Sequence, residues 1–235
     1  MTAVLRFLVF AALLVALLVF VVVPVVASPL LTQMVRDMGF QADELEVTID
    51  SFDPALFGGR ASRLRVQSGS VALSPATVEQ LDLTFQDVSF FERTFENVRG
   101  ELRGVVVTAG GVTVRVSSVQ VDGPARAAQA SGNFTAQESE QLVRLAAERA
   151  GIRLDSVRFV DGGLRVGVAG VETGARIEVS SGALVLMSDF GPAVVLLQPA
   201  PSDPWRLSEA YVASTGVTVI GLVDAARLTA ALPAP

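Results

Sequence analysis

The sequence predicts a mainly β protein with two or more helices, an α+β chain in which a long curved antiparallel sheet wraps around a helix. Apolar residues alternate with polar ones at a period of two through most of the chain, as in half-buried strands. Turn signals recur between these runs, at 67–69, 109–111 and 215–216. Only two segments after the N-terminal region carry helical signals, so few helices are available to cover the sheet.

The chain begins with an apolar export segment. No charged or polar side chain occurs from Phe7 to Ala27, a length close to the roughly 20 residues that cross a bilayer. Arg6 precedes it, and Val25 and Ala27 fit a cleavage site before Ser28. Residues 1–27 are therefore either a signal peptide or an N-terminal membrane anchor. Both alternatives place residues 28–235 outside the cytoplasmic membrane, as a single exported domain.

Two helices are expected in that domain. The first follows Ser28 as N-cap, with Pro29 in the first turn and Gly39 after its end. The second follows Thr135, which forms a capping box with Glu138. Gly151 ends this second helix. Its expected apolar stripe is Leu142, Val143, Ala146 and Ala150, flanked by Leu145.

The strands are identified by their apolar sets, which share a spacing of two. These sets are Leu45, Val47 and Ile49; Leu81, Leu83 and Phe85; Val112, Val114 and Val116; Val157 and Phe159; Leu164, Val166 and Val168; Ile177 and Val179; Leu184 and Leu186. Such one-sided strands must curl around a helix or close on another sheet. Incomplete curling would leave an elongated apolar groove that suits acyl chains.

The segments after the two helices resemble one another. Residues 38–47 align with 150–159 without a gap, matching Gly39 to Gly151 and Asp43 to Asp155. This predicts either a duplication of 28–122 and 123–235 or only the common form of a helix-to-strand joint.

Composition argues against most enzyme classes. The chain has no His and no Cys, and all 18 basic residues are Arg. The usual general base, thiolate nucleophile, Schiff-base amine and zinc ligands are therefore missing. We expect no catalytic residues, no metal and no cofactor. A net charge of −6 also argues against a nucleic-acid partner. A hydrolase using only carboxylates remains a further alternative, although acidic pairs such as Glu44 and Glu46 fall on polar strand faces.

Two segments are candidate lipid contacts. In "SFDPALFGGRASRLRV" (51–66) the apolar tip could touch acyl chains, while the arginines could bind phosphate. The alternative is a tip that plugs the core, with arginines on a solvent face. In "TFQDVSFFERTFENV" (84–98) adjacent aromatics would point to opposite faces of a strand, unless both turn inward at a strand end. The candidate lipid-binding residues are Phe52, Leu56, Phe57, Phe90, Phe91, Phe95, Arg60 and Arg63.

The stretch "SFDPALFGGRASRLRV" (51–66), together with "LDLTFQDVSF" (81–90), "SEQLVRLAAERAG" (139–151) and "VRFVDGGLRVGV" (157–168), resembles the LmeA-like phospholipid-binding family of bacterial envelope proteins. The resemblance covers most of 40–168 and departs from the family pattern at Phe52-Asp53-Pro54. It implies a tubular lipid-binding fold and binding of phospholipid or glycolipid at the cytoplasmic membrane. We therefore expect an exported, non-enzymatic lipid-binding protein of the cell envelope. The alternative is a structural or protein-interaction module with a closed β core.

Overall fold

The fold was analysed in a computed structural model of the chain. It describes residues 44–49, 59–73, 76–92, 94–109, 112–189 and 191–230. The predicted export segment (1–27), the first expected helix (28–40), and Phe52, Leu56 and Phe57 lie outside the described residues. Within the described ranges the chain is mainly β, as expected, with two short helices.

The first of two antiparallel sheets contains ten strands. Eight of them follow one another in the order β1-β2-β5-β6-β7-β8-β15-β14, and the hairpin of β3 and β4 joins through β4 to β6. The strands are β1 Glu46–Thr48, β2 Arg60–Ser68, β3 Val71–Leu73, β4 Ala76–Val78, β5 Gln80–Ser89, β6 Asn97–Ala109, β7 Val112–Pro124, β8 Ala128–Thr135, β14 Trp205–Ala213 and β15 Gly216–Val223.

The second sheet is a five-stranded meander in the order β13-β12-β11-β10-β9. Its strands are β9 Ser156–Val160, β10 Gly163–Val168, β11 Val171–Ser180, β12 Ala183–Ser188 and β13 Val194–Leu197. This sheet is formed between β8 and β14 along the chain. The sequence predicted one long sheet, and the structure has two, because the five strands that follow α3 pair only with one another.

The alternation expected from the sequence positions the core. Leu81, Leu83 and Phe85 of β5 are buried, as are Val114 and Val116 of β7. Strand β12 departs from this pattern, because Ala183 to Leu186 are buried on both of its faces. Strand β14 of the large sheet contacts β11 and β12, which accounts for the second covered face.

Helix α3 (Ala136–Arg149) confirms the second expected helix. Thr135 is its N-cap, and the capping box with Glu138 is complete in both directions. The expected buried stripe is wrong at Ala150, which is exposed. Ala147 is buried instead, because the helix ends at Arg149 and the chain turns away at Ala150. Helix α4 (Ala225–Ala230) was not foreseen; it packs near the β7–β8 turn, where the Ala226 N–H donates to the Ala125 carbonyl oxygen.

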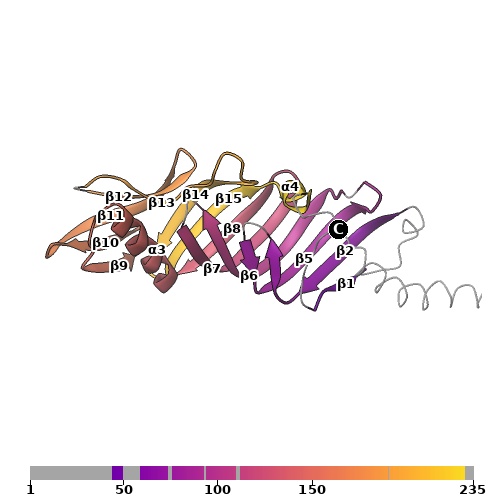
Figure 1. Cartoon of the computed structure of the whole chain (residues 1–235), viewed down its shortest axis with the longest axis horizontal. Helices are drawn as coiled ribbons and strands as arrows, with labels where there is room; N and C mark the ends of the chain where they lie inside the picture. The colour runs from indigo at the N-terminus through magenta and orange to yellow at the C-terminus, as the bar shows by residue number, and fades with distance from the viewer. Residues whose placement is uncertain are drawn as a thin grey trace, which may run out of the picture.

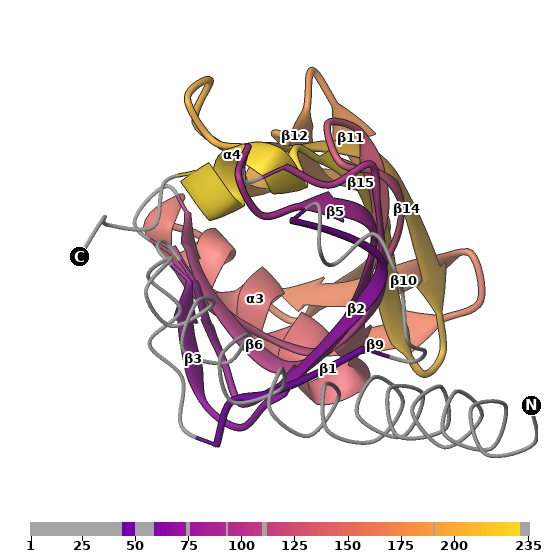
Figure 2. The same ribbon diagram turned by 90° about the vertical axis from the view of Figure 1, so that its right-hand side faces the viewer.

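The molecule is elongated, with the five-stranded sheet at one end and β1 and β2 at the other (Figure 1). Seen along the long axis, the large sheet arches, with β3 and β6 on one side of the view and β2 and β14 on the other (Figure 2). Helix α3 contacts β7, β8 and β15 of the large sheet and β9 and β13 of the small one. The helix thus lies where the two sheets meet, and one cluster of buried apolar residues runs through all three parts.

Candidate functional site

The three aromatic candidates that the structure describes lie around the turn between β5 and β6. Phe90 packs against the core, and its N–H donates to the Gly59 carbonyl oxygen at 2.9 Å. Phe95 packs edge to face on Phe85, with 4.9 Å between ring centroids. Phe91 is 81% exposed, so the interpretation that both adjacent rings turn inward is wrong. One ring faces away from the core, as expected of the pair, but it does so from a turn.

The two arginine candidates are exposed on β2. Arg60 and Arg63 lie on the same strand as Arg65, whose guanidinium makes two hydrogen bonds to the Asp82 carboxylate at 2.9 and 2.7 Å. These bonds hold the pKa of Asp82 below its usual value. Neither Arg60 nor Arg63 lines any of the pockets described below, so the structure does not bring them to a common cavity with the aromatics.

An apolar pocket of about 410 Å³ lies at the opposite end of the molecule, between the C-terminal end of α3 and the five-stranded sheet. Ala147, Ile152 and Leu154 form its helix side. The sheet contributes Val166, Val168, Val171, Leu186 and Val194, with the polar side chains of Thr173 and Ser188 also present. Ligand pockets range over roughly 300–1,000 Å³ and are lined mainly by apolar side chains. This pocket has both properties.

The way α3 ends creates the helix side of the pocket. Gly151 has φ +75°, a conformation that favours glycine, and its N–H donates to the Glu148 carbonyl oxygen at 2.9 Å. The Ile152 N–H donates to the Ala147 carbonyl oxygen at 2.8 Å. This pair of bonds is a Schellman motif, which reverses the chain and commonly brings an apolar residue after the turn onto the helix. Here that residue is Ile152, and it lines the pocket together with Ala147.

Asp155 holds the sheet side of the pocket in place. Its N–H donates to the Gly167 carbonyl oxygen at 2.8 Å, and its carboxylate accepts from the Gly170 N–H at 2.8 Å. Ala169 and Gly170, with φ +51° and +80°, form the two-residue turn between β10 and β11. The turn brings Val171 to the pocket, where this side chain is 67% exposed. Asp155 therefore connects the segment after α3 to one edge of the pocket.

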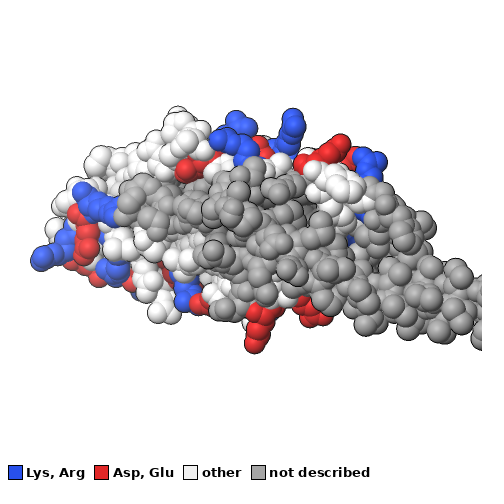
Figure 3. Space-filling model, turned by 45° about the vertical axis from the view of Figure 1, so that its right-hand side comes forward, with Lys and Arg blue, Asp and Glu red and all other residues white. Residues whose placement is uncertain are grey.

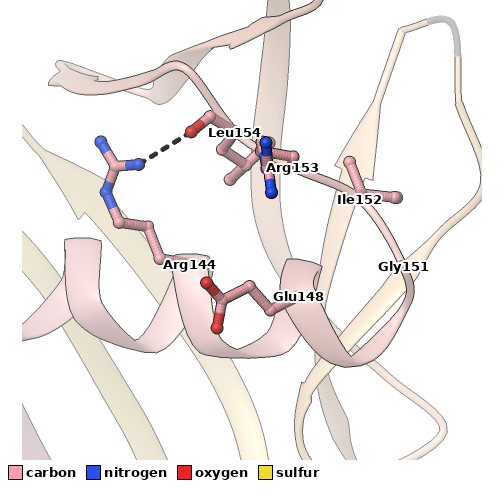
Figure 4. Close-up of a pocket in the computed structure, with 6 residues that line it drawn as sticks. All are labelled: Arg144, Glu148, Gly151, Ile152, Arg153 and Leu154. Atoms are coloured by element: carbon pink, nitrogen blue, oxygen red, sulfur yellow. Dashed lines mark hydrogen bonds between the residues drawn. The ribbon is translucent and has the colours of Figure 1, made fainter.

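A polar hollow of about 280 Å³ adjoins the apolar pocket, and Ile152 and Leu154 line both. Figure 4 shows Arg144 and Glu148 on successive turns of α3, with the connector 151–154 passing over them. Arg144 donates from Nε to the Glu140 carboxylate at 2.8 Å and from Nη1 to the Leu154 carbonyl oxygen at 3.0 Å. Arg153 is exposed and makes no hydrogen bond or ion pair in the described part of the chain.

A third hollow, of about 460 Å³, lies near β1 and is lined by polar and acidic groups that include Glu44, Glu46, Asp82 and Glu101. Glu44 and Glu46 are exposed, as the polar strand face predicted. Among the residues that the structure describes, no three acidic, His or Cys side chains are placed to hold a metal ion. On the face drawn in Figure 3, arginine and acidic side chains are interspersed over the described atoms, without a broad patch of one sign.

Comparisons with protein-family models, with curated proteins and with solved structures found no match to this chain. Across the described ranges, neither helix has the length and apolar character needed to cross a membrane.

The sequence assigned only some of the residues that line the apolar pocket to strands or to the helix, and it assigned none of them to a site. Val166, Val168 and Leu186 appeared only as members of alternating sets. The available signal was the spacing of Gly151, Ile152 and Leu154 directly after an amphipathic helix, which is typical of a chain reversal with apolar contacts. Nothing in the sequence identified Arg153 as a candidate site residue, because a single charged side chain in a connector is commonly only solvated.

Proposed function

We propose that the protein is an exported, non-enzymatic lipid-binding protein of the bacterial cell envelope. It holds an acyl chain in the apolar pocket between the C-terminal end of α3 and the five-stranded sheet. The observation that supports this most strongly is the adjacency of the apolar pocket and the polar hollow, which share Ile152 and Leu154. A lipid has the same division into an apolar chain and a polar head. The arched large sheet agrees with the tubular lipid-binding fold that the sequence resemblance implies.

The pocket can accommodate a useful length of chain. A methylene group and a water molecule have similar volumes, about 30 Å³ for water. A pocket of about 410 Å³ therefore has room for on the order of a dozen methylenes. Each methylene moved out of water contributes about 0.8 kcal/mol. Even partial burial of one chain would offset a substantial part of the free-energy cost of association.

The proposal places lipid at a different end of the molecule from the aromatic candidates. Phe90 and Phe95 contribute to the core beside β5, and Phe91 projects from the β5–β6 turn. In this account Phe91, Arg60 and Arg63 are contacts to a membrane surface or solvent-facing residues, while the acyl chain lies beneath α3. Phospholipid and glycolipid both carry suitable chains, and the cytoplasmic membrane would supply either.

Lipid carried by the protein tests the proposal. The exported region would be purified without detergent, and its bound molecules extracted and analysed by mass spectrometry. We expect co-purifying lipid, and we expect lipid-free protein to take up a fluorescent fatty-acyl phospholipid. Protein that emerges empty and also fails to bind any acyl probe would refute lipid binding.

A second candidate is a structural or protein-interaction module with a closed β core. The observation in its favour is the single buried cluster that joins both sheets and α3. In that case the edge strand β14, on which Tyr211 is 56% exposed, would be the surface to examine. Two results together would favour this candidate. The original chain would carry no lipid, and an envelope protein that co-purifies with it would be lost from the Tyr211→Ser variant.

A further inference from the structure

We propose, building on lipid binding as the function, that the pocket and hollow together select a lipid with one acyl chain and a zwitterionic phosphate head. The chain would occupy the apolar pocket. The phosphate would lie at Arg153 and the remaining N–H groups of Arg144, and the cationic part of the head would lie at Glu148. This assigns a head-group site to the connector after α3.

The size of the pocket limits the number of chains. Its volume of about 410 Å³ corresponds to on the order of a dozen methylenes, which is room for most of one acyl chain and not for two. The walls are fixed on both sides, by the Schellman turn at Gly151 and by the Asp155 contact to the β10–β11 turn. A second chain of equal length would have to remain outside the pocket.

The hollow contains donors that suit phosphate. A guanidinium has five N–H groups, and Arg144 uses one on Glu140 and one on the Leu154 carbonyl oxygen. Its other N–H groups and the whole guanidinium of Arg153 have no partner in the described residues. Guanidinium groups bind phosphate through parallel charge-assisted hydrogen bonds. Both arginines line the hollow, next to the residues it shares with the apolar pocket.

The charge balance of the hollow disfavours a purely anionic head. The Glu140 carboxylate offsets the charge of Arg144, so Arg153 and Glu148 remain as one cation and one anion. The hollow also adjoins the C-terminal end of α3, where the helix dipole contributes partial negative charge. A phosphate joined to an ammonium group matches this arrangement better than a lone carboxylate or phosphate does.

Soluble probes below their micelle concentrations can separate chain number from head charge. Isothermal titration of lipid-free protein would compare dodecylphosphocholine with laurate, which has a similar chain and an anionic head. Diheptanoylphosphatidylcholine supplies the same head on two chains, and phosphocholine supplies the head alone. We expect dodecylphosphocholine to bind at least about tenfold more tightly than each of the others.

Charge variants test the residues. Arg153→Gln should weaken dodecylphosphocholine binding about tenfold, the effect of losing one charge-assisted contact of about 1.4 kcal/mol. Glu148→Gln should reduce the ratio between the affinity for dodecylphosphocholine and the affinity for laurate, because the variant lacks the carboxylate that faces the cationic part of the head. The matched control is Arg158→Gln, an exposed arginine on β9 outside both cavities, which should leave affinity unchanged. Urea unfolding midpoints would show that all three variants are folded.

The outcomes separate the inference from the function on which it rests. Binding of both one-chain and two-chain probes with equal affinity, or an Arg153→Gln variant with the affinity of Arg158→Gln, would overturn the inference and leave lipid binding standing. Binding of phosphocholine as tight as that of dodecylphosphocholine would also overturn it, since the site would then recognise a free phosphate ester. Failure of every acyl probe to bind would refute the proposed function itself.

Discussion

The Arg144 guanidinium donates a hydrogen bond to the carbonyl oxygen of Leu154 at 3.0 Å and so joins helix α3 to the connector that separates the apolar pocket from the polar hollow. Its Nε is held by Glu140, one helical turn earlier. Two of the five N–H groups of the guanidinium are therefore held by hydrogen bonds. Because Leu154 lines both cavities, this bond adds to the two Schellman bonds that hold the connector against the helix.

Arg144→Met should loosen the connector. The variant keeps most of the apolar stem but loses the bond to Leu154, so we expect the free energy of unfolding to fall by about 0.5–1.5 kcal/mol. Backbone amide hydrogens at 152–155 should exchange faster with solvent, because local opening of this segment no longer requires that bond to break. Hydrogen exchange measured by mass spectrometry checks this, with Arg158→Met as control. Unchanged exchange at 152–155 would show that the bond does not hold the connector.

Gly151→Ala should destabilise the protein through backbone conformation alone. A Cβ at Gly151 would meet nothing within 4 Å, but the residue has φ +75°. The expected loss is about 1 kcal/mol in urea unfolding. Gly162→Ala is a matched control, because Gly162 also has φ +82° and open space around it. Both variants should lose similar stability, and only Gly151→Ala should weaken lipid binding. An equal effect of both on lipid would contradict the role given to the Schellman turn.

Thr135→Ala should remove the N-cap of α3. The Thr135 hydroxyl accepts from the Glu138 N–H at 3.3 Å, while the Glu138 carboxylate accepts from the Thr135 N–H at 2.8 Å. We expect a loss of about 1 kcal/mol in the free energy of unfolding. Thr135→Ser keeps the acceptor and should retain most of the stability. If the serine and alanine variants unfold at the same urea concentration, the capping box contributes nothing measurable.

Asp161→Asn should change how stability depends on pH. The Asp161 carboxylate accepts from the Ser214 N–H at 3.0 Å, and this bond lowers the pKa of Asp161 in the folded protein. The folded state therefore binds fewer protons than the unfolded state between the two pKa values. The stabilisation is complete above the ordinary value of about 3.9 and is lost as the pH falls through the lowered folded pKa.

Urea unfolding of the original chain and of Asp161→Asn checks this pH dependence. The difference between their free energies of unfolding should be constant from pH 7 to pH 5 and should shrink at lower pH. Asp87→Asn is the control, because this exposed carboxylate has no hydrogen-bond partner in the described residues. A difference in the free energy of unfolding that grows as the pH falls would contradict this prediction. The bond matters for architecture as well, since the neighbouring Gly162 N–H donates to the Val212 carbonyl oxygen and both bonds join the two sheets.

Local patterns in the sequence predicted much of the fold. Alternation identified the buried faces of β5 and β7, and Thr135 with Glu138 located the start of α3 to the residue. The division into two sheets was not predictable in this way. It depends on which strands pair after α3, and β15 pairs with β8 across some eighty residues of chain. Period-two patterns are the same whichever partner a strand has.

The candidate site was harder to foresee than the fold. Aromatic density drew attention to 84–98, where Phe90 and Phe95 pack against the core. The apolar pocket is lined instead mainly by valines, leucines, an alanine and an isoleucine that look like ordinary core residues in the sequence. Only their packing around the end of α3 leaves space between them. The proposed duplication stays a prediction, although β1 and β9 each form an edge strand of their sheet.

Blocking the pocket tests the central claim most directly. Val171→Trp would place a large ring at the pocket from a side chain that is already 67% exposed, so little stability should be lost. Val195→Trp is the matched control, because Val195 is 50% exposed on β13 and does not line the pocket. Lipid extracted from both variants, purified without detergent, would be quantified by mass spectrometry. The account predicts bound lipid in Val195→Trp and little or none in Val171→Trp; equal amounts in the two variants would contradict it.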